Sequence, residues 1–223
     1  MNAVITGASS GLGKALASAL SKEGYSILMN GRDGEKLKNA SKSIKNSFAL
    51  QGDISEKSAR EKLFSTAIKK FGKIDMLINN AGILIEGPLD KMDPADTEKV
   101  MQTNAIAHME MCRLFYPHMK KNRKGTIVNI ISTTGMVAKE NSSVYAASKF
   151  AMRGFTDSLR FEANKSNVRV FGVYPGGMRT SLFGSERDIS KFMDPKDVAK
   201  AIVAMINNYE NSTGDITIYR MSY

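Results

Sequence analysis

Cysteine, histidine and long apolar runs are scarce in this chain of 223 residues, and each scarcity excludes a class of protein. The single cysteine, Cys112, allows no internal disulfide and offers no metal cluster. The two histidines, His108 and His118, have no metal-ligating companions and are interpreted as structural. No apolar run approaches the roughly 20 residues that span a bilayer. The first residues, MNAVITGASSG, lack the basic region and long apolar stretch of a signal peptide, so we expect a cytoplasmic protein with no membrane partner.

The charge balance is basic. Lysine and arginine number 32 against 22 acidic residues, which gives a formal net charge of +10. Such a balance can indicate nucleic acid, an anionic membrane or an acidic partner. The charges are nevertheless spread along the chain, and the densest cluster, MKKNRKG at 119–125, is typical of the cationic end of a helix followed by a glycine. No nucleic-acid-binding motif accompanies the charge, so we predict a solvated surface and no nucleic-acid partner.

Short apolar runs alternate with amphipathic helical patterns along the whole chain. Several runs are continuously apolar, as expected of strands that are covered on both faces. This alternation predicts right-handed βαβ units and a parallel sheet. Since no repeat, linker or break in composition divides the chain, we predict one domain over residues 1–223. The predicted strands are 2–6, 25–30, 47–51, 74–79, 125–132, 168–175 and 216–219, and the main helical patterns are 12–24, 59–72, 95–121 and 146–166.

A glycine-rich segment, TGASSGLG at 6–13, follows the first predicted strand and opens the first helix. Gly7, Gly11 and Gly13 give the spacing GxxxGxG. Glycines let the backbone approach a pyrophosphate, and a helix N-terminus supplies unpaired N–H donors, to which Ser9 and Ser10 add hydroxyl groups. Tight turns also use glycine for steric reasons alone, but the strand–loop–helix context favours a dinucleotide site.

The end of the second predicted strand bears on the choice of dinucleotide. A carboxylate roughly 20 residues past the glycines marks an NAD site, and counting from Gly13 reaches Asp33. The strand YSILMN, however, is expected to end near Asn30, so that Gly31 and Arg32 face the ribose and Asp33 caps the next helix. The forked donors of Arg32 can pair with a 2′-phosphate. We therefore predict NADP(H) as the cofactor.

Four motifs occur in one order along the chain: TGASSGLG (6–13), NNAG (79–82), a serine at 132 ahead of YAASK (145–149), and PGGMRT (175–180). Together they closely resemble the short-chain dehydrogenase/reductase family over nearly the whole chain. The resemblance implies an α/β fold, a Rossmann-like doubly wound parallel sheet of about seven strands with helices on both faces. It also implies hydride transfer between a nicotinamide and a carbonyl or secondary alcohol.

The resemblance assigns the proton chemistry to four residues. Tyr145 is implied to be the general acid or base, and a phenol with a pKa near 10 needs a nearby cation to act at neutral pH. Lys149, one helical turn away, is expected to be that cation and to hydrogen-bond the nicotinamide ribose. Ser132 is implied to orient the substrate carbonyl. Asn104, otherwise interpreted as an exposed polar helix residue, matches the asparagine that holds a water behind Lys149.

The same resemblance implies a set of cofactor-binding residues. Asp53 matches the acid that caps the adenine amino group, and a role as a helix cap is compatible with it. Pro175, Gly176 and Thr180 match the segment that seats the nicotinamide carboxamide. The NNAG residues are expected to border the adenosine ribose and hold the central strand. The implied set is completed by Leu12, Ile54, Asn79, Ala81, Gly82, Tyr145, Lys149 and Met178.

The sequence leaves the substrate open. A 3-oxoacyl thioester on acyl carrier protein fits because such carriers are acidic and this chain is basic, and a general carbonyl or sugar-type reductase fits no worse. A dinucleotide-sensing regulator on the same fold is the alternative outside the enzymes. The complete set of Ser132, Tyr145 and Lys149 argues against it. A homodimer or homotetramer is a further implication of the resemblance.

Overall fold

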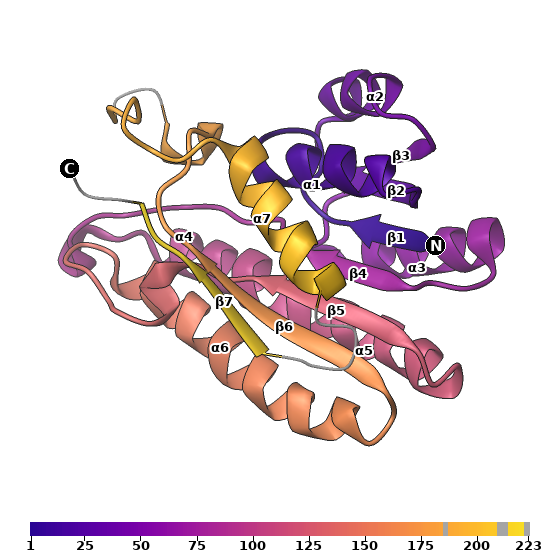
Figure 1. Ribbon diagram of the computed structural model, residues 1–223. Helices are drawn as coiled ribbons and strands as arrows, with labels where there is room; N and C mark the ends of the chain where they lie inside the picture. Colours follow the sequence, from indigo (N-terminus) through magenta and orange to yellow (C-terminus); the bar gives the residue numbers. More distant parts are fainter. Residues whose placement is uncertain (185–186, 209–213, 221–223) are drawn as a thin grey trace.

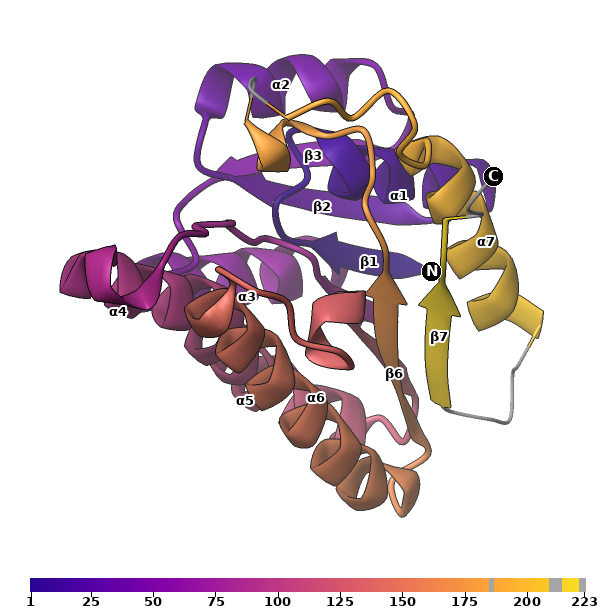
Figure 2. The same cartoon turned by 90° about the vertical axis from the view of Figure 1, so that its left-hand side faces the viewer.

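The computed structural model describes residues 1–184, 187–208 and 214–220. Within these ranges, parallel strands form one seven-stranded sheet in the order β3-β2-β1-β4-β5-β6-β7 (Figures 1 and 2). The predicted α/β fold with its doubly wound parallel sheet is therefore confirmed. The strands are β1 (Asn2–Ile5), β2 (Ser26–Gly31), β3 (Ser47–Gln51), β4 (Met76–Asn79), β5 (Gly125–Ile130), β6 (Val168–Pro175) and β7 (Gly214–Ile218).

Helices cover both faces of this sheet (Figure 1). Leu16, Leu37 and Ile202 anchor α1, α2 and α7 in the core of one face. Leu63, Phe115 and Leu159 do the same for α3, α5 and α6 on the other face. The longer helices are α1 (Gly11–Lys22), α2 (Gly34–Lys42), α3 (Lys57–Phe71), α4 (Pro94–Met101), α5 (Ala107–Lys121), α6 (Ser143–Asn164) and α7 (Pro195–Asn208). None of the helices in the described ranges is long and apolar enough to cross a bilayer.

The strand order reverses direction between β1 and β4, which are neighbours in the sheet. From this point β2 and β3 extend to one side, and β5, β6 and β7 extend to the other. Loops that leave the carboxyl ends of β1 and β4 consequently turn towards opposite faces, and in sheets of this kind ligands bind in the crevice between such loops. The topology alone therefore indicates where a dinucleotide would lie.

The helical pattern predicted over 95–121 is interrupted near its middle. Here α4 continues into a π-helical segment, Gln102–Ile106, and that segment continues into α5. A π-helical turn carries an extra residue and rotates the side chains that follow it. Asn104 lies in this segment and is completely buried. The alternative interpretation of Asn104 as an exposed polar residue is therefore wrong.

Several strands end earlier than the sequence predicts. β1 ends at Ile5 and β5 ends at Ile130, so that Thr6 and Ser132 lie in the loops beyond them. The side chain of Thr6 holds the loop that follows β4. Its Oγ1 accepts hydrogen bonds from the N–H groups of Asn80 at 2.9 Å and Ala81 at 3.1 Å. The early strand ends thus release polar side chains for the loops that form the crevice.

Candidate active site

The loop between β1 and α1 lies so close to the backbone of the loop after β4 that only glycine fits at its turn. Gly7 has a φ of 63°, and a Cβ there would lie 2.7 Å from the Cα of Ala81. A Cβ on Gly13 would collide with the carbonyl oxygen of Gly7. Ser10 precedes α1 and makes no side-chain cap, so the first N–H groups of the helix stay available. A pyrophosphate can therefore be held by backbone donors at this turn.

A cavity of about 1100 Å³ opens at the carboxyl edge of the sheet, next to this turn. It collects loops that follow β1, β2, β3, β4, β5 and β6. Of the predicted site residues, it is lined by Gly7, Ser9, Ser10, Gly11, Leu12, Gly31, Arg32, Asp53, Ile54, Ala81, Gly82, Ser132, Tyr145, Lys149, Pro175, Gly176, Met178 and Thr180. Gly13, Asn79 and Asn104 are not among the residues that line it.

The second strand ends one residue later than expected, at Gly31, and Arg32 directly follows it. An Nη1 atom of Arg32 lies 3.9 Å from Oδ2 of Asp53 across the cavity mouth. Asp33 also lines the cavity, and it caps α2, where its Oδ1 accepts a hydrogen bond from the N–H of Lys36 at 2.9 Å. The prediction of a helix cap at Asp33 is confirmed, and Arg32 and Lys36 bring two cations to the same part of the cavity.

The loop after β3 is held by a buried arginine that the sequence analysis missed. Asp53 accepts two hydrogen bonds from Ser55 in a local turn, at 2.9 Å from the backbone N–H and at 2.8 Å from the hydroxyl. Arg60 donates from Nη1 to the carbonyl oxygens of Ile54 at 2.6 Å and Ser55 at 2.8 Å. Gln102, at the start of the π-helical segment, also donates to the Ser55 carbonyl at 3.0 Å. These donors fix the carbonyl groups of the loop in place.

The prediction that Asn79 borders the ribose is wrong. Its side chain is completely buried, and its Nδ2 donates to Oδ1 of Asn129 on β5 at 2.9 Å. The same Nδ2 lies 3.2 Å from the sulfur of Cys112, which confirms the cysteine as a buried thiol. Because side chains alternate between the faces of a strand and its continuation, Asn80 lines the cavity instead. Asn79 therefore ties β4 to β5.

Asn104 and His108 lie one helical turn apart beneath the loop that follows β4. The amide of Asn104 pairs with the backbone of Ile83, with both hydrogen bonds at 2.9 Å, and donates to the Ser148 hydroxyl at 3.3 Å. The Nε2 atom of His108 lies 2.7 Å from the carbonyl oxygen of Ala81. Because a carbonyl only accepts, this Nε2 carries the ring proton. Burial first, and then the charge of Lys149, lowers the pKa of His108 to about 3.

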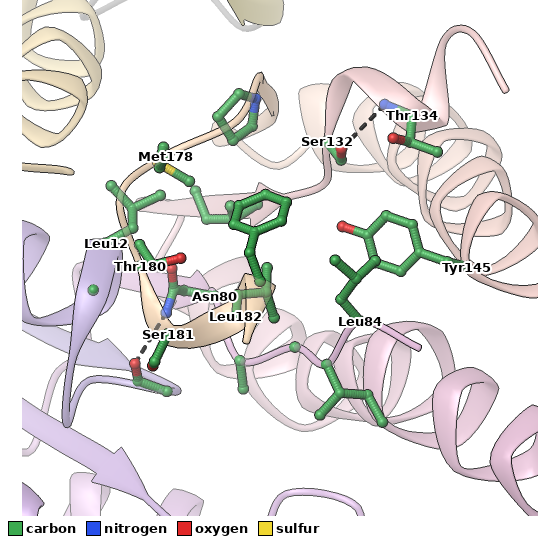
Figure 3. A pocket seen from close by; sticks show the side chains of 18 of the residues that line it. Leu12, Asn80, Leu84, Ser132, Thr134, Tyr145, Met178, Thr180, Ser181 and Leu182 are labelled. Carbon is green, nitrogen blue, oxygen red and sulfur yellow. Dashed lines mark hydrogen bonds between the residues drawn. The ribbon is translucent and has the colours of Figure 1, made fainter. Parts of the chain in front are cut away.

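Three of the four side chains predicted to carry the chemistry, those of Ser132, Tyr145 and Lys149, meet in one half of the cavity, and Asn104 lies buried beneath it. Figure 3 shows Tyr145 and Ser132 together, with the hydroxyl of Tyr145 directed into the pocket and Leu84 beside the ring. Ser132 is fixed because its Oγ accepts a hydrogen bond from the N–H of Thr134 at 3.0 Å. Lys149 comes from the next turn of α6, and its Nζ lies 5.5 Å from the centre of the Tyr145 ring. Met178 and Thr180 form the opposite wall.

Burial dominates the titration of this pair, which differs from the expectation that Lys149 lowers the pKa of Tyr145. Burial raises the pKa of Tyr145 to about 12; a hydrogen bond with Ser132 opposes this effect and the charge of Glu86 adds to it. Burial lowers the pKa of Lys149 to about 8. Two desolvated groups each favour their neutral form, and the charge of Lys149 is not among the causes that shift the pKa of Tyr145.

The comparisons with known proteins identify the class. Residues 1–190 match the family model of the short chain dehydrogenases. The chain therefore belongs to the short-chain dehydrogenase/reductase family of oxidoreductases, which confirms the resemblance found in its motifs.

Named relatives fall in the same family. The chain is 33% identical over 207 residues to an uncharacterized oxidoreductase of Staphylococcus saprophyticus, covering 90% of this chain and 88% of that protein. It is 35% identical over 214 residues to a ketoacyl reductase of Nostoc sp., covering 92% and 75%. It is 30% identical over 212 residues to carbonyl reductase family member 4 of Xenopus tropicalis, covering 92% and 90%.

A solved structure shows the same fold. The alcohol dehydrogenase of the archaeon Thermococcus sibiricus, complexed with 5-hydroxy-NADP, superimposes with a TM-score of 0.91 at 21% identity. The match covers 100% of this chain and 99% of that one.

Proposed function

We propose that this chain is an NADP(H)-dependent oxidoreductase that transfers a hydride between the nicotinamide and a carbonyl or secondary alcohol, with residues 1–223 as one catalytic domain. The observation that carries the proposal is the position of Ser132, Tyr145 and Lys149. All three line the cavity whose other end is formed by the glycine-rich turn. A cofactor held at that turn would extend towards the catalytic side chains.

The residues present fit a dinucleotide. The close approach of Gly7 to Ala81 leaves no room for a Cβ, so the turn stays compact and its backbone borders the cavity. The uncapped start of α1 supplies the donors that a pyrophosphate needs. When bound, the cofactor supplies the hydride, and the protein supplies orientation and the proton.

The hydroxyl groups of Ser132 and Tyr145 would both hydrogen-bond the oxygen of a substrate carbonyl. Tyr145 is protonated at neutral pH, as any phenol is, and burial raises its pKa further, so it holds a proton that it can donate to the developing alkoxide. Lys149 stabilises the tyrosinate that results. Asn104 holds the Ile83 backbone behind this lysine, beside Gly82, so that the floor of the site stays in place.

The preference for NADP(H) is supported by charge at the ribose end. Arg32 and Lys36 line the cavity there, and Asp33, which could bind a ribose hydroxyl, is engaged in capping α2. A 2′-phosphate would find a forked arginine donor within reach of a second cation. Asp53 remains available beside Ile54 for the adenine amino group.

For the substrate, we propose a neutral ketone or aldehyde, with a 3-oxoacyl thioester on acyl carrier protein as one member of this class. The basic charge of the chain and the ketoacyl reductase and carbonyl reductase among its relatives support this choice. We also propose a homodimer or homotetramer, which the relatives' names do not address and which sedimentation would measure.

The experiment compares wild-type protein with Tyr145→Phe for NADPH oxidation across a panel of carbonyls that includes a short 3-oxoacyl thioester. The variant keeps the ring and removes the proton donor, so we expect turnover to fall by about 100-fold or more while the Kd for NADPH stays within about twofold. Equal turnover in the two proteins would contradict the mechanism. Tight NADPH binding with no turnover in the wild type would instead favour the dinucleotide-sensing regulator.

A further inference from the structure

A carboxylate and an arginine form an ion pair in the half of the cavity that holds Tyr145, where the proposed reaction would take place. Glu86, in the loop after β4, accepts a hydrogen bond at Oε2 from Nη2 of Arg187, at 2.8 Å. Its other oxygen, Oε1, accepts from the Ser142 hydroxyl at 2.7 Å. All three residues line the cavity. Ser142 directly precedes α6, the helix that carries Tyr145, so Glu86 connects three segments around the proposed proton donor.

Glu86 is the more firmly held member of this pair. Its side chain is 24% exposed, against 47% for Arg187. The adjacent residue, Gly87, donates its N–H to the carbonyl oxygen of Asn141 at 2.8 Å, which ties the same loop to the start of α6 a second time. Arg187 lies over the ring of Phe183, with its guanidinium carbon 5.4 Å from the ring centre. The carboxylate therefore has a fixed place in the wall, and the arginine is held against it.

The charge of Glu86 reaches the reacting centre. It is one of the groups that raise the pKa of Tyr145. Lys139 and Arg220 also line this cavity and would attract anions. A substrate carboxylate next to the reacting carbonyl, however, would have to take Arg187 from Glu86 and would leave two negative charges in one partly enclosed space. Like charges that share a partly enclosed space oppose each other more strongly than they do in water.

We propose that the Glu86–Arg187 pair is a charge filter that admits carbonyl compounds with no charge beside the reacting carbonyl and rejects oxo acids. This inference rests on the proposed function and narrows it to esters, thioesters, simple ketones and aldehydes. A 3-oxoacyl thioester passes the filter because its carboxyl group is esterified. The corresponding free 3-oxo acid does not.

The test uses two substrates that share one ketone and differ only in charge, methyl 3-oxobutanoate and 3-oxobutanoate, each with NADPH. The wild type is expected to prefer the ester in kcat/KM by about tenfold or more. Glu86→Gln keeps the shape of the side chain, removes its charge and frees Arg187, so the preference should fall by about tenfold. Glu140→Gln is the matched control. It removes one negative charge from a residue that also lines the cavity but is not among the groups that shift the pKa of Tyr145, so the preference should change much less than in Glu86→Gln.

A second variant tests the direction of the effect. Arg187→Gln leaves the Glu86 charge unpaired, so the preference for the ester should rise. The filter is overturned if Glu86→Gln changes the preference no more than Glu140→Gln does. It is equally overturned if Arg187→Gln moves the preference towards the acid.

A binding measurement separates failure of the filter from failure of the proposed reductase. The Kd values of 3-hydroxybutanoate and its methyl ester are measured by calorimetry on wild type and Glu86→Gln with NADP⁺ present, which requires no turnover. If neither ketone is reduced but Glu86→Gln alone loses discrimination between acid and ester, the filter stands and reduction of these compounds is refuted. If both ketones are reduced, and if the hydroxy acid and its methyl ester bind equally well, the reductase stands and the filter is refuted.

Discussion

Lys149 has the titration most relevant to activity at the scale of single residues. Burial lowers its pKa to about 8, so its positive charge is complete below that pH and disappears above it. Tyr145 keeps its proton throughout this range, because its pKa is raised to about 12. We therefore expect kcat/KM for NADPH, which reports groups of the free enzyme, to fall as the pH rises through about 8.

A pH–rate profile from pH 6 to pH 10 measures this limb, and two variants identify its origin. Lys149→Arg retains a cation at every pH of the series, so its lower activity should stay flat above pH 8. Lys149→Met should be weak at all pH values. A descending limb that persists unchanged in Lys149→Arg would assign it to another group.

Arg32 is the residue on which the proposed preference between cofactors depends. Arg32→Gln should weaken NADPH binding by about 10- to 100-fold, because it removes a charge-assisted pair with the 2′-phosphate and leaves Asp53 unpaired nearby. NADH carries no such phosphate, so its Kd should change by no more than about threefold. The control is Arg113→Gln, which removes an exposed, ion-paired arginine from α5. Equal losses for the two dinucleotides would contradict the proposal.

Single residues differ in how well the sequence predicts them. Tyr145, Lys149 and the glycines belong to motifs in which close spacing fixes the geometry, so their positions can be predicted. Glu86 and Arg187 are 101 positions apart, and no local pattern links them. Asn79 lies in a recognised motif, but which face its side chain takes depends on where β4 ends.

At the scale of elements, the π-helical segment and the first turn of α5 together connect the loops of the site. Gln102 holds the loop after β3, Asn104 holds the loop after β4 at Ile83, and His108 holds it at Ala81. An uninterrupted α-helix would place these side chains on a different sequence of faces. The π-helical segment and the start of α5 thus hold the loops after β3 and β4 in place beneath the cavity.

Because of His108, the free energy of unfolding is expected to depend on pH in acid. The unfolded chain binds a proton on this histidine below its ordinary pKa of 6.5, whereas the folded chain binds it only at about 3. The unfolded state therefore holds more protons between these values, and the free energy of unfolding falls by up to about 1.4 kcal/mol per pH unit as the pH falls through this window. His108→Gln removes that contribution and keeps an amide donor for Ala81.

Urea unfolding at pH 7 and at pH 4.5 measures the effect. The free energy of unfolding of His108→Gln should depend less on pH than that of the wild type. His108→Leu leaves the Ala81 carbonyl without its donor and should lose roughly 1–3 kcal/mol at pH 7. The comparison variant His118→Gln removes a half-buried histidine whose pKa burial also lowers, but by less, so it should lose a smaller part of the acid dependence than His108→Gln does. An acid dependence that is equal in wild type and His108→Gln would contradict the assignment.

Most elements could be predicted because apolar runs and amphipathic patterns alternate clearly along the chain. The π-helical segment could not, since its extra residue shifts the phase of the 3.6-residue pattern only once, and the sequence on either side reads as ordinary amphipathic helix. The helix α7 was not singled out, although its apolar face covers the same side of the sheet as α1. Strand ends were displaced by one or two residues, because polar loop residues such as Thr6 continue the strand pattern in the sequence.

At the scale of the whole molecule, the reversal of strand order places one end of the cavity at the glycine-rich turn and the other at Ser132 and Tyr145. An extended dinucleotide can connect these ends only if its nicotinamide lies beside the tyrosine. The sequence motifs predicted the family and the fold correctly, and the strand order determines where the crevice lies. The identity of the substrate depends on side chains from distant loops, which is why the sequence left it open.

The central claim is that a hydride passes from the nicotinamide to a carbonyl carbon in this cavity. Its most direct test is the reduction of methyl 3-oxobutanoate with NADPH deuterated at the transferred position of nicotinamide C4, followed by mass spectrometry and NMR of the alcohol. We expect one deuterium on the new carbinol carbon in the product of the wild-type protein. An alcohol formed without deuterium at that carbon, from cofactor labelled at either position of C4, would contradict it.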